Sequence, residues 1–501
     1  MRRTRIPGTS RKRQCAEAKE TFGVPALISM LEATAIGASS SYFSVRRQGP
    51  VVLLQPRPPR ESSSQDNRRC TRRMQWSTGE VARLPRSSST CGLPPIFNLL
   101  DVTSCGGLRQ KSGMDQCLQV ALFAGTDAIA RRSNFIFSPL SMRTGLALLA
   151  TGTNGETLRQ LLTFLGSQDL HLLNAASASL VAEMRAWPQL TFAAGIFADR
   201  SFSLRPEFVS GAASAHRASV RSVDFQNQPA AAAAEVNALI AETTRGRIRD
   251  LVSPDSFRGD PKIVLANAMH FKATWSRRFD RSDTTRSEFH RLDGTSVRAP
   301  FLSAPGMQYA TSFDDLGFKV LQCFYKMAGR DGKLDPKAPL FSMLIFLRHR
   351  RDGLRDLLRL AVTEPDFVMR CAPRREQVVN PCLLPKFKFS FRFDATDALR
   401  GLGLAAPFDP LAADLSGAVS NMPPEGLYVS AVEQVCAVEV DEEGTTAVAS
   451  FYAPTNPTYS PFERPPPPPM SFVADHPFLF AIIEYGKGEV LFLGHVVDPS
   501  S

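Results

Sequence analysis

The side chains that could support catalysis occur in this 501-residue chain, but they stand in no catalytic pattern. The sequence has no G-x-S-x-G nucleophile elbow and no G-x-x-x-x-G-K-[ST] phosphate loop. Its seven histidines include no H-E-x-x-H zinc motif. A hydroxyl or thiol nucleophile needs an adjacent base or a lowered pKa before it reacts. We therefore expect that the protein is not an enzyme.

The nine cysteines form no C-x-x-C pair, so the usual zinc spacing is missing and we expect no metal or other cofactor. They are Cys15, Cys70, Cys91, Cys105, Cys117, Cys323, Cys371, Cys382 and Cys436. An odd number without a clean secretory signal favours reduced thiols. We expect an intracellular, most simply cytoplasmic, protein, with secretion left open.

We interpret isolated polar residues as parts of the folded structure and not as catalytic groups. His270 stands in an apolar run, which favours a core histidine, or one near an exposed strand end, over a general base. Asp441 and Glu442 are interpreted as solvated surface charges, because charged side chains are mostly exposed.

The charge excess belongs to the front of the chain. Residues 1–113 hold 19 Lys and Arg against 7 Asp and Glu, a net charge of +12, which leaves −1 for the remainder of the +11 total. The body therefore lacks the basic surface of a nucleic-acid-binding protein. The one apolar patch of the front, residues 24–38, contains Glu32 and is too short to span a membrane. We expect neither nucleic acid nor a membrane as a partner.

Residues 1–113 are predicted to be disordered, because their Arg- and Ser-rich sequence carries no period of 3.6 or 2. Such a composition is also typical of an organelle transit peptide. Alternatively, translation begins at Met114, where patterned sequence starts. We favour the second interpretation and place the folded domain at residues 114–501.

Helices and strands are both predicted in this body. Residues 154–166 place leucines at i, i+3, i+4 and i+7, with Asn154 as N-cap and Gly166 as the stop. Residues 236–246 repeat this pattern. Residues 263–271 and 340–347 are almost continuously apolar, as in strands covered on both faces. Alternation in 385–394 predicts a strand with one wet face, and Y-G-K-G near residue 486 predicts a hairpin.

An ordered series of segments runs from Met114 to Pro499 and comprises N-F-I-F-S-P-L-S-M, G-T-N-G-E-T-L-R-Q-L-L-T-F-L-G, V-N-A-L-I-A-E-T-T-R-G-R-I-R-D-L-V, L-A-N-A-M-H-F-K-A-T-W-S-R-R-F, L-P-K-F-K-F-S-F-R-F-D and F-V-A-D-H-P-F-L-F. Together these segments resemble the serpin family, most closely its plant-type branch. One motif departs from the family pattern, with Leu239 in place of a tryptophan. The resemblance implies a mixed α and β domain of three β-sheets with eight or nine helices. It also implies an exposed reactive loop at about residues 441–470 and a monomer.

The resemblance further implies a mechanism and a partner. A serine or cysteine protease, chymotrypsin-like or trypsin-like, attacks the loop and forms an acyl-enzyme. The cleaved loop then inserts into the central sheet as a new strand before water completes hydrolysis. The resemblance assigns the hinge, which enters first, to Glu443, Gly444, Thr445, Thr446, Ala447, Val448 and Ala449.

The second half of the loop departs from what insertion needs. Thr445, Ala447 and Ala449 would face the core and are small, but Phe451 is large. Pro454 and Pro457 each lack the N–H that a central strand donates. We therefore expect impaired trapping of protease.

The scissile bond has several candidates. Counting forward from Gly444 gives Thr458, and counting back from Met470 gives Phe462, followed by Glu463. Phe462 would suit a chymotrypsin-like protease and Arg464 a trypsin-like one.

The shutter and breach, which control opening of the sheet in the family, match six residues here. They are Ser138, Ser141, Asn267, Trp275, Lys386 and Gln434. Gln434 replaces the family's histidine, and an amide can both donate and accept, so the hydrogen-bond cluster is expected to survive in altered form.

Three functions remain open from the sequence. The first is a suicide-substrate inhibitor of proteases with impaired trapping. The second is a non-inhibitory member that is cleaved as a substrate or serves as a binding scaffold. The third and weakest is an adaptor that uses the proline run Pro465–Pro469 as a polyproline-II ligand.

Overall fold

The structure is a computed structural model, and it describes residues 113–257, 262–329, 333–424, 426–444 and 468–501. The predicted disordered extension, residues 1–113, lies outside this range except for Gly113. Most of the reactive loop also lies outside it.

Nine α-helices occur in the described residues, within the number that the family resemblance implies. They are α2 (Gly113–Ala130), α3 (Pro139–Ala150), α4 (Gly155–Leu165), α5 (Leu170–Ala186), α6 (Pro206–Ala215), α7 (Pro229–Thr243), α8 (Leu354–Thr363), α9 (Phe367–Arg370) and α10 (Thr396–Gly401).

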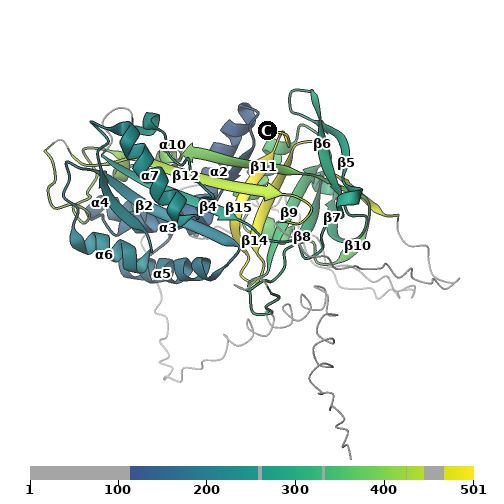
Figure 1. The fold of residues 1–501 in the computed structure, drawn as a ribbon, viewed down its shortest axis with the longest axis horizontal. Coiled ribbons are helices and arrows are strands. Elements are labelled where there is room, and N and C mark those ends of the chain that lie inside the picture. The colour runs from purple at the N-terminus through teal and green to yellow at the C-terminus, as the bar shows by residue number, and fades with distance from the viewer. Residues whose placement is uncertain (1–112, 258–261, 330–332, 425, 445–467) are drawn as a thin grey trace, which may run out of the picture. The chain divides into compact units, whose positions relative to one another are not determined.

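A five-stranded sheet has the order β11-β12-β4-β2-β3. Its strands are β11 (Phe387–Asp394), β12 (Val429–Val440), β4 (Ile263–Phe271), β2 (Leu190–Asp199) and β3 (Ser219–Val223). The central neighbours β12 and β4 run parallel, whereas β11 and β2 are antiparallel to the strands they flank. Figure 1 shows this sheet beside the strands of a second sheet.

The second sheet has ten strands in the order β1-β15-β14-β9-β8-β7-β10-β6-β5, with β13 on β10. They are β1 (Phe135–Phe137), β15 (Glu489–Val496), β14 (Phe478–Glu484), β9 (Phe341–Arg348), β8 (Phe318–Phe324), β7 (Gly306–Phe313), β10 (Glu376–Pro385), β6 (Ser296–Ser303), β5 (Thr285–His290) and β13 (Met470–Val473).

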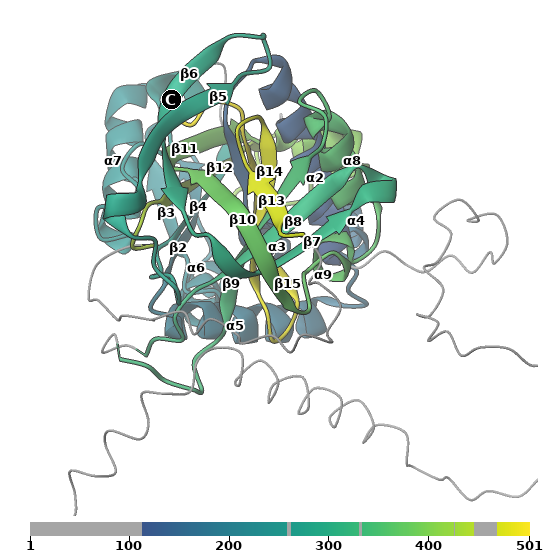
Figure 2. The ribbon, with the colours of Figure 1, turned by 90° about the vertical axis from the view of Figure 1, so that its right-hand side faces the viewer.

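The long strand β10 joins two parts of this second sheet. Its first half pairs with β7 and its last three residues pair with β6. Figure 2 views this sheet with β10, β7 and β8 toward the reader. The three predicted sheets therefore occur as one separate sheet and two that β10 connects.

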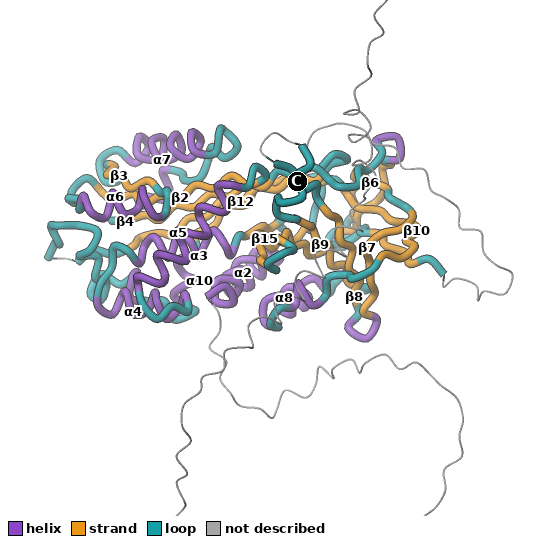
Figure 3. Tube along the Cα trace, turned by 90° about the horizontal axis from the view of Figure 1, so that it is seen from below, coloured by secondary structure: helices purple, strands orange, loops and turns teal. Residues whose placement is uncertain are grey.

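Helices cover both faces of the five-stranded sheet. In Figure 3, α7 lies on one face, and α3 and α5 lie on the other. Alternate residues of β12 serve the two faces, since Val432 and Cys436 join the main core and Ala431 and Val435 join the smaller core under α7. The central strands are thus buried on both faces, which explains their almost continuous apolar sequence.

Most of the periodic predictions are confirmed. Strand β4 is buried throughout except for His270, and β11 alternates as expected. Strands β14 and β15 form the predicted antiparallel hairpin. His270 is half-buried near the end of β4, with the Arg247 guanidinium 3.4 Å from its Nδ1, as one of the two interpretations had it.

The predicted N-cap residue of α4 is at the expected position but does not make the expected capping bond. Asn154 is the N-cap of α4, and Gly166 ends the helix in the left-handed region at φ 66°. The Asn154 side chain accepts no bond from the helix, however, and its Nδ2 donates to the Ser416 hydroxyl at 2.9 Å. A tertiary contact has replaced the local cap.

Candidate functional site

The candidate site is the boundary between the parallel strands β4 and β12. The two strands pair from Ile263 and Val429 to His270 and Ala437. A segment that leaves the end of β12 and folds back between them would lie antiparallel to both. Because β11 and β2 flank this pair, such a strand would be central and would need ladder bonds on both of its edges.

Gln434 holds β12 to the start of α3. Its Nε2 donates to the Ser138 carbonyl and its Oε1 accepts from the Ser138 N–H, both at 3.0 Å. The Ser138 hydroxyl caps α3 by accepting from the Ser141 N–H at 3.1 Å, and it donates to the Met269 sulfur at 3.0 Å. The structure therefore brings Ser138, Ser141 and Gln434 together, as the resemblance implied.

Asn267 is the register partner of Gln434 but does not join this cluster. It is fully buried, and within the described ranges neither its amide oxygen nor its amide nitrogen has a hydrogen-bond partner. The Ser141 hydroxyl is equally unpaired. The Asn267 amide packs against Gly145, where it leaves no room for a Cβ. Burying an unpaired amide costs about 1–3 kcal/mol, so Asn267 lacks the stabilisation that Gln434 gains from its hydrogen bonds.

Trp275 ties the end of β4 to the end of β12. Its ring is buried and stacks on Tyr325 with centroids 4.3 Å apart. Its Nε1 donates to the Asp441 carbonyl at 2.9 Å, and its backbone N–H donates to the Glu443 carbonyl at 3.0 Å. These two bonds close the sheet where a hinge would enter.

Glu442 corrects a prediction, because it is not a solvated surface charge. The carboxylate is buried and pairs with the Lys386 Nζ at 2.7 and 3.0 Å, while the Thr284 hydroxyl donates to it at 3.0 Å. Burial raises the pKa of Glu442, but the hydrogen bonds from Lys386 and Thr284 outweigh this and leave the pKa below its ordinary value. The pair keeps the predicted residue Lys386 at the site.

Only the first two residues of the predicted hinge are described. Arg281 pairs with the Glu443 carboxylate at 2.6 Å. Gly444 has φ 79° and lies against the backbone of Trp275, so both its conformation and the close approach require glycine. The rest of the hinge, Thr445–Ala449, and the scissile candidates Thr458, Phe462 and Glu463 lie outside the described residues.

Sequence reasoning missed Met269, Arg281, Thr284 and the role of Glu442. Met269 could have been found, because it lies two residues after Asn267 and so on the same face of β4. Arg281 and Thr284 belong to a short 3-10 segment and its end, where no periodic signal exists. Their contacts with Glu443 and Glu442 join residues about 160 positions apart, and only the fold brings them together.

Other kinds of site were sought in the described part of the chain. It holds no group of three His, Cys, Asp or Glu residues that could share a metal ion. It also holds no helix with the length and apolar character needed to cross a bilayer. Its five cysteines, Cys117, Cys323, Cys371, Cys382 and Cys436, are all free thiols.

Comparison with known proteins identifies the fold and its relatives. The family model described as "Serpin (serine protease inhibitor)" matches residues 117–499. The chain is 68% identical over 390 residues to "Putative non-inhibitory serpin-10" of Oryza sativa subsp. japonica, covering 77% of this chain and 100% of the relative. It is 54% identical over 404 residues to "Putative non-inhibitory serpin-Z11" of the same organism, covering 77% and 99%.

The chain is also similar to plant serpins whose names do not include the word non-inhibitory. Serpin-Z1C of Triticum aestivum is 39% identical over 388 residues, covering 76% of this chain and 94% of the relative. Among solved structures, Arabidopsis AtSerpin1 in its native stressed conformation superposes with a TM-score of 0.69 at 35% identity, covering 79% of this chain and 100% of that one.

Proposed function

This chain belongs to the serpin family, and from that premise we propose that it is a non-inhibitory serpin. Proteases cleave its loop as an ordinary substrate, and the acyl-enzyme is hydrolysed before the loop can insert. This replaces the inhibitor with impaired trapping that the sequence favoured. The names of the rice relatives at 68% and 54% identity support the change.

The observation that carries the proposal is the central position that an inserted loop would take in the five-stranded sheet, between β4 and β12. Trapping in this family needs the cleaved loop to pair with β12 on one side and β4 on the other. Pro454 and Pro457 cannot donate to either neighbour, and a central strand has no free edge on which a proline is tolerated. Each lost ladder bond forfeits about 0.5–1.5 kcal/mol, and a buried carbonyl left unpaired adds to this.

The closed end of the sheet adds a second obstacle. Before the hinge can insert, the Trp275 bonds to the carbonyls of Asp441 and Glu443 must break. The ladder between β4 and β12 must then open along its length. Because insertion competes with hydrolysis of the acyl-enzyme, each added barrier shifts the outcome toward a released, active protease.

One feature favours retained inhibition. Thr445, Ala447 and Ala449 are small, so the first half of the hinge could enter the sheet without steric conflict. Insertion would then stall at Phe451 and the prolines. A partly inserted loop does not carry the protease across the molecule, and the protease escapes.

The proposal is tested by cleaving the loop and measuring thermal stability before and after. In an inserting serpin, cleavage releases stored strain and raises the melting temperature sharply. We expect the cleaved full chain to melt within a few degrees of the uncleaved one. A large rise would show that the loop inserts and would overturn the proposal. Mass spectrometry of the same sample locates the cut among Thr458, Phe462 and Arg464.

A further inference from the structure

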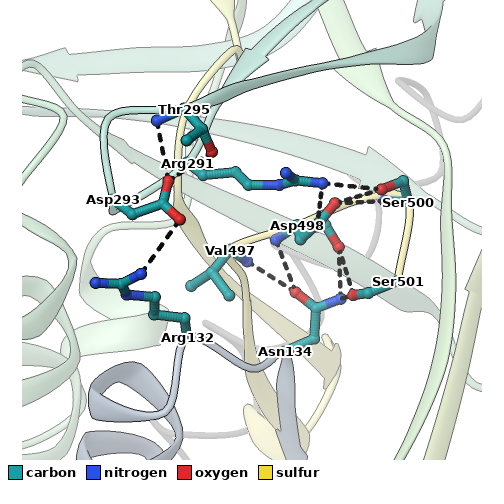
Figure 4. A network of polar contacts seen from close by, with 9 residues as sticks. All are labelled: Arg132, Asn134, Arg291, Asp293, Thr295, Val497, Asp498, Ser500 and Ser501. Atoms are coloured by element: carbon teal, nitrogen blue, oxygen red, sulfur yellow. Dashed lines mark hydrogen bonds and ion pairs between the residues drawn. The ribbon is translucent and has the colours of Figure 1, made fainter.

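A polar cavity that shares no lining residue with the site described above is built from three separate chain segments. It has a volume of about 230 Å³ and is lined by Arg132, Arg291, Leu292, Asp293, Val497 and Asp498. These come from the turn after α2, the turn between β5 and β6, and the segment after β15. Figure 4 shows Arg132 and Asp293 on one side and Arg291 and Asp498 on the other. The space exceeds the roughly 30 Å³ that one water occupies in the liquid.

The two carboxylates at the cavity are already supplied with donors. Asp293 Oδ1 accepts from the N–H and hydroxyl of Thr295 at 2.9 and 2.6 Å, and Oδ2 accepts from Arg132 Nη1 at 3.3 Å. Hydrogen bonds from Thr295 hold the pKa of Asp293 below its usual value, so this carboxylate stays charged. Asp498 also accepts hydrogen bonds from a neighbouring residue and pairs with an arginine.

Asp498 Oδ1 accepts from the N–H and hydroxyl of Ser500 at 2.9 and 2.6 Å, and its Oδ2 lies 2.6 Å from Arg291 Nη2. The two guanidiniums, by contrast, have donors to spare, because each carries five N–H groups. The Arg291 Nε is buried and has no hydrogen-bond partner within the described ranges. The unsatisfied groups at this cavity are therefore donors, which is the complement of an oxyanion.

Arg132 occupies a backbone position that favours glycine. It has φ 57°, and the bonds from its N–H to the Ile129 carbonyl and from the Ser133 N–H to the Ala128 carbonyl form a Schellman cap on α2. A residue other than glycine is strained in this left-handed conformation. The cap fixes the position of Arg132 at the cavity, and the same left-handed conformation occurs at Arg217 and Arg245.

We propose that this cavity binds a compact tetrahedral oxyanion, a free phosphate or sulfate or the phosphoryl group of a small organic molecule. Arg291 and Arg132 supply guanidinium N–H groups from opposite sides of the cavity. The bound anion would join the turn between β5 and β6 to the end of α2 and to the segment after β15. Ligand binding to the folded state alone raises its stability.

The test is a titration of the full chain with sodium phosphate at constant ionic strength, read by thermal unfolding and by ³¹P NMR. We expect a saturable rise in melting temperature and a saturable change of the phosphate resonance, neither of which an equal ionic strength of chloride produces. Glycerol phosphate forms a second arm. Tighter binding of the ester assigns the site to an organic phosphoryl group, and equal binding assigns it to the free ion.

Arg132→Gly is the matched variant, because it removes the guanidinium while giving the cap its preferred residue. It should fold at least as stably as the parent and bind phosphate at least tenfold more weakly, since a charge-assisted hydrogen bond is lost. Arg291→Gln should weaken binding as well. The control is Arg131→Gln, which alters an exposed neighbour that pairs with Asp127 and does not line the cavity. Unchanged phosphate binding in Arg132→Gly, or no saturable response in the parent, would overturn the proposal.

Discussion

At the scale of single residues, two neighbouring amides of the central sheet differ in what they bind. Gln434 satisfies both backbone groups of Ser138, whereas the amide of Asn267 has no partner in the described part of the chain. Buried polar groups stabilise a fold only when paired, so the two residues should differ in their contribution to the free energy of unfolding. The side-chain hydrogen bonds that join β12 to the start of α3 thus rest on Gln434.

Replacing Gln434 by Ala should lower the free energy of unfolding by about 1–3 kcal/mol, because it strands the buried Ser138 N–H. The Ser138 carbonyl keeps its bond from the Met142 N–H at 3.1 Å. Asn267→Ala is the matched comparison and should cost less, since it breaks no hydrogen bond of the described residues. Urea unfolding of both variants checks the order. If Asn267→Ala is the more damaging, then an ordered water or another partner satisfies that amide.

At the scale of elements, strand β12 carries a buried acid on the face opposite Gln434. Glu433 lies on the α7 side of the sheet, where burial and then the neighbouring Asp394 carboxylate raise its pKa to about 7. The folded state therefore holds the Glu433 proton more tightly than the unfolded state does. The stabilisation is complete below the ordinary pKa of 4.5 and is lost as the pH rises toward 7.

Glu433→Gln should remove this pH dependence, because the amide mimics the protonated acid. Relative to the parent, the variant should gain about 2–3 kcal/mol of stability between roughly pH 5 and pH 8, since one pKa unit corresponds to 1.36 kcal/mol. Urea unfolding at the two pH values measures the gain. An equal difference between variant and parent at both values would mean that the carboxylate is already charged when folded.

The loop is the element that decides between cleavage and trapping. Replacing Phe451 by Thr, and Pro454 and Pro457 by Ala, restores small side chains and two ladder donors to the strand that must insert. The fraction of protease held in covalent complex should rise relative to the parent, and cleavage should now raise the melting temperature. Pro466→Ala is the control, because it follows every candidate cut and should change neither measurement. No gain in the triple variant would place the block elsewhere.

The elements were predictable to the extent that their signals are local. Strand alternation in β11, the hairpin of β14 and β15 and the helix stop at Gly166 depend on neighbouring residues and are confirmed. The bonds of Glu442 were not predictable, because its partner Lys386 lies 56 positions away. The identities of Ser138 and Gln434 as partners came from family resemblance, and no local pattern carries them.

At the scale of the whole molecule, the serpin body occupies only part of the chain. The family model matches residues 117–499, and the rice relative at 68% identity is covered completely by 77% of this chain. From its sequence, the basic segment 1–113 is predicted to be disordered. Brief digestion with trypsin should therefore remove it and leave a stable fragment that begins near Met114. A loop-cleaved chain that still carries residues 1–113 after this digestion would show that the segment is protected.

The central claim is that this serpin is cleaved without trapping its protease. The direct measurement is to incubate the full chain with a chymotrypsin-like and, separately, a trypsin-like protease, then to count SDS-resistant covalent complexes against cleaved chains. We predict that nearly all encounters yield a chain cut within residues 458–464, while the protease keeps its activity over many turnovers. Protease consumed close to one-to-one in a covalent complex would contradict this, and would mean that Phe451 and the prolines do not prevent insertion.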